Sequence, residues 1–237
     1  MHRFYIDSIE NGKCRLSSKD MHHALHVLRL RTGDQVEIIC QENRYLAVLL
    51  DQDILKITKQ LPSTEPALQI SLFQGIPKGD KMDWIVQKAA EIGIVRIVPV
   101  MMQRCVVKLS PQDYEKKRSR WERIAREAGK QSGRCRIPAV MPPVYLSGLP
   151  SLPSLPETCI VPWEEAQGTG PRAFIQSHPG LRSLGILIGP EGGIDSEEMQ
   201  LLGPDFIPVT LGPRILRTET AGLAAASAIL ALSGEME

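Results

Sequence analysis

Hydrophobic and polar positions follow two different patterns along the chain, and the first covers its N-terminal part. Residues 3–7 alternate between the two kinds, and the stretches 36–40, 45–50 and 54–58 have the short alternating or apolar character of strands. Only residues 20–30 have the spacing of a helix in this part. Several short strands with one helix predict a small β-barrel.

The pattern changes after the segment Leu61–Pro66, which reads LPSTEP and is typical of a linker. Beyond it, strand-like and helix-like stretches alternate: strands at 68–74, 94–100, 158–162, 184–188 and 206–211, and helices at 80–91, from Ser110, at 171–177 and from Thr218 to Leu232. Such alternation predicts an α/β domain with a mostly parallel sheet. We therefore expect two domains, a barrel over residues 1–66 and an α/β domain over residues 67–237.

Charge is even over the whole chain but uneven along it. The formal net charge is +1, which by itself indicates no partner. Between Arg104 and Arg136, however, eleven basic residues stand against four acidic ones, a local excess of seven positive charges. This excess is the footprint expected for a polyanion such as RNA, and it is equally compatible with the solvated face of a helix.

Cysteine and histidine spacing gives little sign of a disulfide framework or a metal. The five cysteines are odd in number and no two have CxxC spacing, so we expect reduced thiols in a cytoplasmic protein. The beginning of the chain lacks the apolar stretch of a signal peptide, and no stretch has the length needed to cross a membrane. His22 and His26 have helical spacing, but without a third ligand we expect no metal site.

Two glycine-rich loops carry the main chemical signal. The strand at 184–188 runs directly into Gly189-Pro190-Glu191-Gly192-Gly193, after which Asp195 and Glu198 predict a helix with a capping box. The strand at 206–211 runs into Gly212-Pro213-Arg214, and a helix follows. Since the carboxyl ends of parallel strands share one edge of a sheet, both loops are expected together, where ligands bind in such folds. Each loop alone is more simply a left-handed turn, but the pair favours a site.

A second glycine motif is less specific. Residues 168–173 match GxGxxA, which in a dinucleotide-binding fold directly follows a strand and begins a long helix. Here residues 163–167 intervene, and Pro179-Gly180 ends the following helix early. We therefore do not interpret it as a dinucleotide site.

Longer motifs support a family assignment. The chain has KGDKMDWIVQKAAEIGI at 78–94, RCVVK at 104–108, RWERIAREAGKQSGRCRIP at 120–138 and HVLRLRTGD at 26–34, besides GPEGG and LGPRILRTETA. In their order along the chain, these motifs resemble those of the RsmE family of ribosomal RNA methyltransferases, in the SPOUT class. The chain departs slightly from the family pattern at Ile194-Asp195, where Phe followed by Ser or Thr is common.

The resemblance implies a fold, a reaction and partners. It implies an N-terminal PUA-like barrel that binds RNA, a trefoil-knotted SPOUT methyltransferase domain and a homodimer. The substrate would be N3 of one uridine in 16S rRNA of the small ribosomal subunit, and the cofactor would be S-adenosyl-L-methionine (SAM). Nothing in the spacing of the residues indicates the knot, which rests on the resemblance alone.

Roles for individual residues follow from the loops and the resemblance. We expect SAM to be lined by two stretches and one aromatic residue: Leu187, Ile188, Gly189, Pro190, Glu191, Gly192 and Gly193; Leu211, Gly212, Arg214, Ile215 and Leu216; and Trp163, whose alternative is core packing. Arg214, Arg217 and Glu219 are the candidates for catalysis. The alternative for the two arginines is an ion pair with Glu191 or Glu219, and Glu219 either acts as a base or holds its loop. The residues expected to bind RNA are basic: Arg29, Arg31, Lys116, Lys117, Arg120 and Arg134.

Two other functions remain open from the sequence. One is a methyltransferase of the same fold that acts on a tRNA ribose 2′-oxygen. The other is an RNA-binding assembly factor that has kept the fold and lost the cofactor.

Overall fold

The structure is a computed structural model that describes residues 1–107 and 110–236. The chain forms two compact units. Unit 1 comprises residues 1–65 together with 133–136, and unit 2 comprises residues 66–132 and those from 137 onward. Lys108, which belongs to the basic stretch and to the RCVVK motif, lies outside the described residues.

Unit 1 is a curled five-stranded sheet with a short helical segment. Its elements are β1 (Arg3–Tyr5), β2 (Lys13–Arg15), α1 (Ser18–His22), the π-helix η1 (His23–Val27), β3 (Gln35–Cys40), β4 (Asn43–Leu49) and β5 (Ile54–Leu61). The strands lie in the order β1-β3-β4-β5-β2, with β1 parallel to β3 and the other pairs antiparallel. Inward side chains such as Val36, Ile38 and Leu55 form a core of their own. The sheet fits the barrel that the sequence predicts.

The helical segment of unit 1 begins and ends earlier than predicted. Ser17 caps it, since its hydroxyl accepts a hydrogen bond from the backbone nitrogen of Asp20 at 3.1 Å. It ends at Val27, and Arg29 has a φ of 55°, which no helix accommodates. The strand β2 was not predicted, because three residues are too few to show a period.

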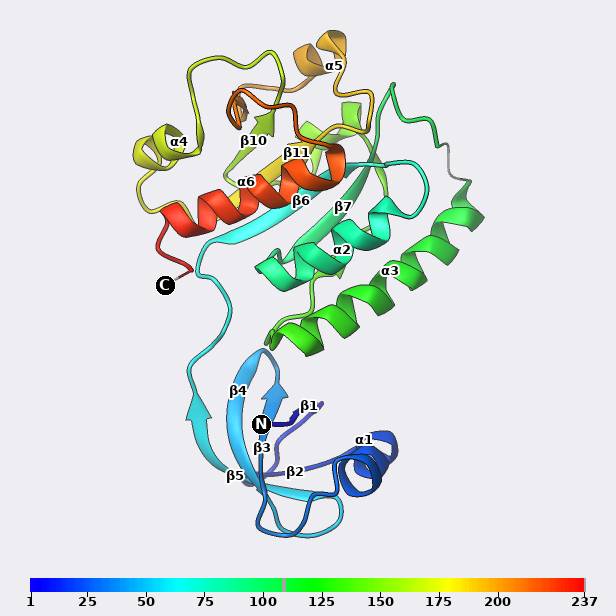
Figure 1. Cartoon of the computed structure of the whole chain (residues 1–237), viewed down its shortest axis with the longest axis vertical. Helices are drawn as coiled ribbons and strands as arrows, with labels where there is room; N and C mark the ends of the chain where they lie inside the picture. Colours follow the sequence, from blue (N-terminus) through cyan, green and yellow to red (C-terminus); the bar gives the residue numbers. More distant parts are fainter. Residues whose placement is uncertain (108–109, 237) are drawn as a thin grey trace. The chain divides into compact units, whose positions relative to one another are not determined.

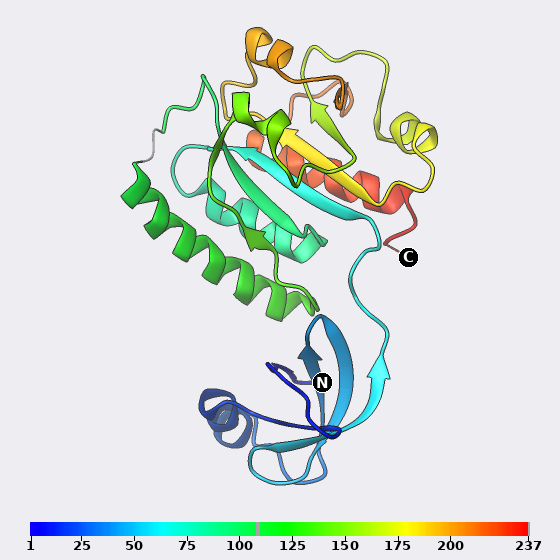
Figure 2. The ribbon, with the colours of Figure 1, turned by 180° about the vertical axis from the view of Figure 1, so that it is seen from behind.

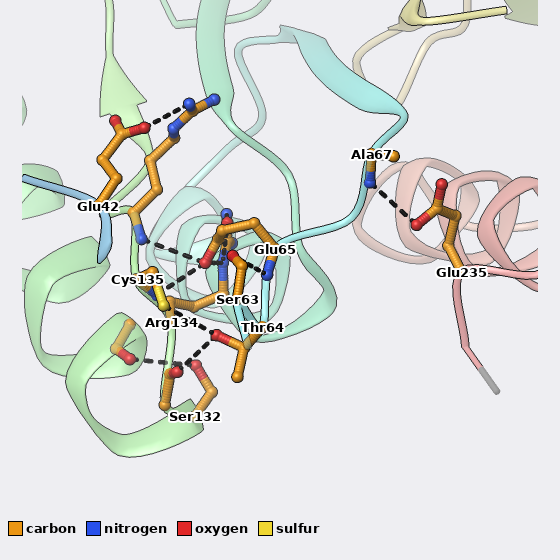
Figure 3. Close-up of polar contacts among 12 residues, drawn as sticks. Glu42, Ser63, Thr64, Glu65, Ala67, Ser132, Arg134, Cys135 and Glu235 are labelled. Carbon is orange, nitrogen blue, oxygen red and sulfur yellow. Dashed lines mark hydrogen bonds and ion pairs between the residues drawn. The ribbon is translucent and has the colours of Figure 1, made fainter. Parts of the chain in front are cut away.

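Arg134 is buried within unit 1, which contradicts its predicted role on the RNA-binding surface. The residue is 3% exposed, and its Nη2 lies 2.6 Å from Oε2 of Glu65. Glu65 also accepts hydrogen bonds from the backbone nitrogens of Cys135 at 2.7 Å and Arg136 at 3.1 Å (Figure 3). The carboxylate of Glu65 thus holds residues 133–136 in unit 1. The prediction for Arg134 is wrong because a charge pattern along the chain cannot show a distant partner.

Unit 2 is built on a parallel seven-stranded sheet (Figures 1 and 2). Its strands are β6 (Gln69–Gly75), β7 (Arg96–Met101), β8 (Ala139–Val140), β9 (Val144–Tyr145), β10 (Thr158–Pro162), β11 (Ser183–Ile188) and β12 (Phe206–Val209). Its helices are α2 (Lys81–Ile92), α3 (Pro111–Ser132), the 3-10 helix η2 (Leu146–Ser151), α4 (Pro171–Ser177), α5 (Ser196–Leu201) and α6 (Thr218–Leu232). The strand order is β12-β10-β11-β6-β7-β8, with β9 also beside β7, and every pair is parallel. The α/β prediction is confirmed.

Alternate residues of the strands supply two separate cores. Leu72 and Ile186 point into the core that α2, α3, α4 and α6 cover, and their neighbours Phe73 and Leu187 point into the core on the opposite face. Figure 1 shows α2 and α6 running across the first face. Small residues let α6 approach closely, since a Cβ at Gly222 would lie 2.9 Å from Leu72 Cδ1. The helix α6 therefore packs closely against β6.

Two local predictions in unit 2 need correction. The strand β12 ends at Val209, two residues earlier than expected. Asp195 does cap α5, accepting a hydrogen bond from the backbone nitrogen of Glu197 at 2.9 Å. Glu198, however, does not complete a capping box, because its carboxylate accepts a hydrogen bond from the backbone nitrogen of Gln103 at 2.7 Å instead. The helices were also compared with the length and hydropathy that a membrane span requires. Among the described residues, no helix meets both requirements.

Candidate functional site

The carboxyl ends of β10, β11 and β12 meet at one edge of the sheet and surround a cavity of about 690 Å³. Pro162 ends β10 and Trp163 follows it, residues 189–191, 193 and 194 follow β11, and residues 210–217 follow β12. The first turn of α6 and Lys81 of α2 complete the wall. A volume of this size suits a small-molecule cofactor, and its place agrees with the general position of ligands in parallel sheets.

Most residues predicted to hold the cofactor line this cavity. They are Trp163, Ile188, Gly189, Pro190, Glu191, Gly193, Leu211, Gly212, Arg214, Ile215 and Leu216. Leu187 does not line it, because alternation along β11 places this fully buried side chain in the core of the opposite face. Gly192 does not line it either, since a Cβ there would lie 3.1 Å from Cβ of Arg104. Trp163 both lines the cavity and packs against that core, so its two alternatives are compatible.

The loop 189–193 packs tightly against the end of β6 and against itself. Neither Gly75 nor Gly189 has room for a side chain. A Cβ at Gly75, the last residue of β6, would lie 2.6 Å from the nitrogen of Pro190. A Cβ at Gly189 would lie 2.8 Å from the carbonyl carbon of Gly193. Gly193 itself has a φ of 72°, which favours glycine. The loop therefore keeps its shape only with glycines at these positions.

A buried chain of hydrogen bonds ties the same loop to α6 and β6. Nε2 of Gln74 donates to Oγ1 of Thr218 at 2.9 Å, and this hydroxyl donates to the carbonyl oxygen of Gly189 at 2.6 Å. Gln74 is fully buried and Thr218 is 7% exposed. Gln74 was not expected at the site, because no local pattern reveals which distant segments meet.

Arg104 holds the loop from its outer side. Its Nη1 donates to the carbonyl oxygen of Gly192 at 2.9 Å, and its Nη2 lies 2.7 Å from Oδ2 of Asp195. The hydrogen bond from the backbone of Glu197 and the guanidinium of Arg104 both lower the pKa of Asp195. The carboxylate therefore stays charged at neutral pH, and the clamp persists there.

Lys81 pairs with two glutamates at the cavity, Glu191 and Glu219, which the sequence had offered as partners for arginines. Its Nζ lies 2.9 Å from Oε1 of Glu191 and 3.3 Å from Oε2 of Glu219. The hydrogen bond to Glu191 is the main cause that raises the pKa of Lys81. Burial would raise the pKa of Glu191, but hydrogen bonds from Lys81 and from backbone nitrogens lower it. Among the described residues, Arg214 and Arg217 form no ion pair, so that alternative is wrong here.

The second loop is open by comparison. Arg214, Ile215 and Arg217 are exposed, Ile215 by 85%. The loop's backbone is held near its start, where the nitrogen of Gly212 donates to Oγ1 of Thr210 at 3.2 Å. Two arginines and an exposed apolar side chain thus flank the cavity on this side. Such an arrangement can attract a polyanion and contact a base.

The residues expected to bind RNA are dispersed over both units. Arg29 and Arg31 are exposed in unit 1. In unit 2, Lys116 is exposed and Lys117 half-buried on α3. Arg120 is also exposed on α3, where it forms an ion pair with Asp83 of α2, so it is not a free cation. These positions leave their role in RNA binding as a prediction.

The two weaker motifs lie at short helical segments, His22 and His26 in α1 and η1 and the GxGxxA segment at the start of α4. The rings of His22 and His26 are adjacent, with centroids 4.7 Å apart. No group of three or more potential metal ligands occurs among the described residues. The GxGxxA segment leads into α4, which has only seven residues and does not follow β10 directly.

Known proteins resemble the chain over nearly its full length. A family model for the RNA methyltransferase domain matches residues 64–230. The ribosomal RNA small subunit methyltransferase E of Bacillus subtilis is 36% identical over 97% of this chain and 96% of that protein. The chain belongs to this RNA methyltransferase family. The resemblance to the RsmE family is thereby confirmed.

Solved structures of the family agree with the fold. The ribosomal RNA small subunit methyltransferase E of Neisseria gonorrhoeae, bound to S-adenosyl methionine, superposes with a TM-score of 0.79 at 31% identity and covers 98% of both chains. A Legionella pneumophila protein in complex with the bound cofactor SAM gives a TM-score of 0.76 at 31% identity, over 97% of this chain and 96% of that one. The family members thus share both units of this chain.

Proposed function

We propose that this chain transfers the methyl group of SAM to N3 of one uridine in 16S rRNA of the small ribosomal subunit. The observation that carries the proposal is the cavity at the carboxyl edge of the sheet, which both glycine-rich loops line. The names of full-length relatives support rRNA as the substrate, and relatives solved with SAM support the cofactor. These names specify no atom or base, and N3 of one uridine is our addition to them.

The residues of the cavity fit this cofactor. A Cβ at Gly189 would lie 2.8 Å from the carbonyl carbon of Gly193, and the φ of 72° at Gly193 favours glycine, so at these two positions the loop offers backbone groups to a ligand. Ile188, Leu216 and Trp163 supply apolar walls for a flat ring. SAM supplies an electrophilic methyl group on a sulfonium, so the protein's contribution is mainly alignment.

The exposed arginines are the best candidates for the substrate side. N3 of uracil carries a weakly acidic proton, and its loss leaves negative charge on the ring. Arg214 and Arg217 lie at the cavity without an ion pair among the described residues, so a guanidinium can stabilise that charge or grip a phosphate. Glu219 is engaged by Lys81, which favours a holding role over that of a base.

Unit 1 and the basic residues of α3 are our candidates for further RNA contacts. We assign unit 1 as a PUA-like RNA-binding domain, with Arg29 and Arg31 toward RNA. The basic face of α3, with Lys116 and Lys117, extends the same function within unit 2. A trefoil knot and a homodimer, which follow from the family resemblance alone, complete the proposal. So does a cytoplasmic place, which rests on the number and spacing of the cysteines.

Labelled SAM tests the reaction directly. Small subunits and naked rRNA from cells that lack the protein are incubated with it, and the modified nucleotide is mapped by mass spectrometry. We expect label on a single uridine base. Label on a ribose, or no incorporation into any RNA although SAM binds, would show that the proposed reaction is wrong.

A further inference from the structure

Lys81 lies where three segments distant in the sequence converge on the cavity. It is the first residue of α2, Glu191 belongs to the loop after β11, and Glu219 belongs to the first turn of α6. The three side chains are 32%, 28% and 21% exposed, so the cluster is partly shielded from water. All three residues line the cavity.

Both carboxylates depend on this one ammonium for charge compensation. Oxygens of Glu191 and Glu219 lie 2.9 Å and 3.3 Å from the same nitrogen, so the two acids are close neighbours. No other lysine or arginine of the described residues forms an ion pair with either of them. Without the ammonium, two partly shielded negative charges would repel each other across the cavity wall.

The backbone contacts indicate what such repulsion would displace. Both carboxylate oxygens of Glu191 accept from the backbone nitrogen of Lys78, at 3.1 Å and 3.3 Å. The nitrogen of Gly193 donates to the carbonyl oxygen of Pro190 at 3.0 Å. A shift of Glu191 away from Glu219 would therefore disturb both the segment before α2 and the turn that lines the cavity.

We propose that Lys81 is a positioning residue, which holds the loop 189–193 against α6 by bridging Glu191 and Glu219 and so keeps the cavity shaped for SAM. The inference rests on the proposed function for its ligand. The bridge itself is a property of the free protein and can be tested without any ligand.

Variants that remove charges one at a time can distinguish an ion-pair bridge by Lys81 from simple packing of its side chain. Lys81→Met keeps most of the length of the side chain and removes the charge, and Lys81→Met/Glu219→Gln then removes one of the two repelling carboxylates. Lys81→Arg restores the charge. Lys88→Met is the matched control, because Lys88 lies on the same helix, is 34% exposed and pairs with Glu91.

Hydrogen–deuterium exchange in the free protein is the first measurement. We expect exchange in peptides covering residues 76–80 and 189–194 to accelerate at least threefold in Lys81→Met and to return toward wild type in the double variant and in Lys81→Arg. The Lys88→Met control should exchange like wild type in these peptides. Unchanged exchange in Lys81→Met, or a double variant as fast as the single one, overturns the bridge.

Calorimetric titration with SAM is the second measurement. At pH 8 we expect the Kd to rise about tenfold in Lys81→Met and to fall back to within about threefold of wild type in the double variant. The other charged groups that line the cavity, Glu164, Arg214 and Arg217, are common to all variants. Binding in Lys81→Met equal to wild type overturns the positioning role, whereas a wild type that binds no SAM contradicts the proposed function and leaves the exchange result to decide on the bridge.

Discussion

The two loops at the cavity are similar in sequence and very different in how they are held. The loop 189–193 is held by hydrogen bonds from Arg104 and Thr218, by the ion pair with Lys81 and by the tight approach of Gly75. The loop 211–217 leaves its arginines unpaired among the described residues and exposes Ile215 by 85%. A fixed backbone can bind a small invariant ligand, while an open basic loop can adapt to a large one. The difference therefore supports cofactor binding by the first loop and substrate binding by the second.

The most damaging change to the fixed loop should be Gly189→Ala. Its Cβ would lie 2.8 Å from the carbonyl carbon of Gly193 and 3.0 Å from the nitrogen of Ile194, and backbone cannot yield there without moving the loop. We expect the Kd for SAM to rise at least about 100-fold, or ~2.7 kcal/mol, by calorimetry. Gly203→Ala is the control, because a Cβ at Gly203 meets nothing within 4 Å, and it should bind like wild type. Tight binding by Gly189→Ala would show that the loop is not fixed.

The buried hydrogen bonds beneath the loop should matter for stability. Thr218→Val leaves Nε2 of Gln74 and the carbonyl oxygen of Gly189 without their shared partner. We expect the free energy of unfolding to fall by about 1–3 kcal/mol in a denaturant titration. The exposed Thr220 lies on the same helix, and Thr220→Val should change it by less than about 0.5 kcal/mol. Equal effects of the two variants would contradict a special role for Thr218.

The outer clamp on the loop should have a smaller effect. Arg104 is 44% exposed, so solvent weakens its pair with Asp195, although its hydrogen bond to Gly192 remains. We expect Arg104→Met to raise the Kd for SAM about threefold to tenfold by calorimetry. Arg126→Met, an exposed arginine on α3, serves as the control and should leave the Kd unchanged. A Kd for Arg104→Met that equals this control would mean that the clamp does not shape the cavity.

A change of pH around neutrality should have the smallest effect on SAM binding by the loop 189–193. The pKa of Lys81 is raised, so its charge is lost only above the usual lysine range, near ~10.4. The pKa of Glu191 is lowered, so its charge is lost only as the pH falls below the usual glutamate range, near ~4.3. The pair therefore stays charged in between, and we expect the Kd for SAM to vary less than about twofold from pH 6 to 9. A titration centred inside that window would contradict the charge states assigned to Lys81 and Glu191.

The sequence predicted the loops better than it predicted what surrounds them. Glycine and proline directly after a buried strand are local signals, so Gly189 and Gly212 could be placed at one sheet edge before the fold was known. Lys81, Gln74 and Arg104 reach the site from distant segments. Local sequence patterns do not predict such tertiary contacts. For the same reason Arg134 read as a surface cation, although Glu65 buries it in an ion pair. The alternation along β11 could have excluded Leu187, because its neighbour Ile188 lines the cavity.

The division of labour between the loops is tested most directly by Arg214→Ala. Calorimetry with SAM and methyl transfer to small subunits are measured on the same preparation of this variant. We predict a Kd within about twofold of wild type and a methyl-transfer rate at least about tenfold lower, because Arg214 serves the substrate and not the cofactor. Loss of SAM binding in Arg214→Ala, or transfer at the wild-type rate, would contradict the account.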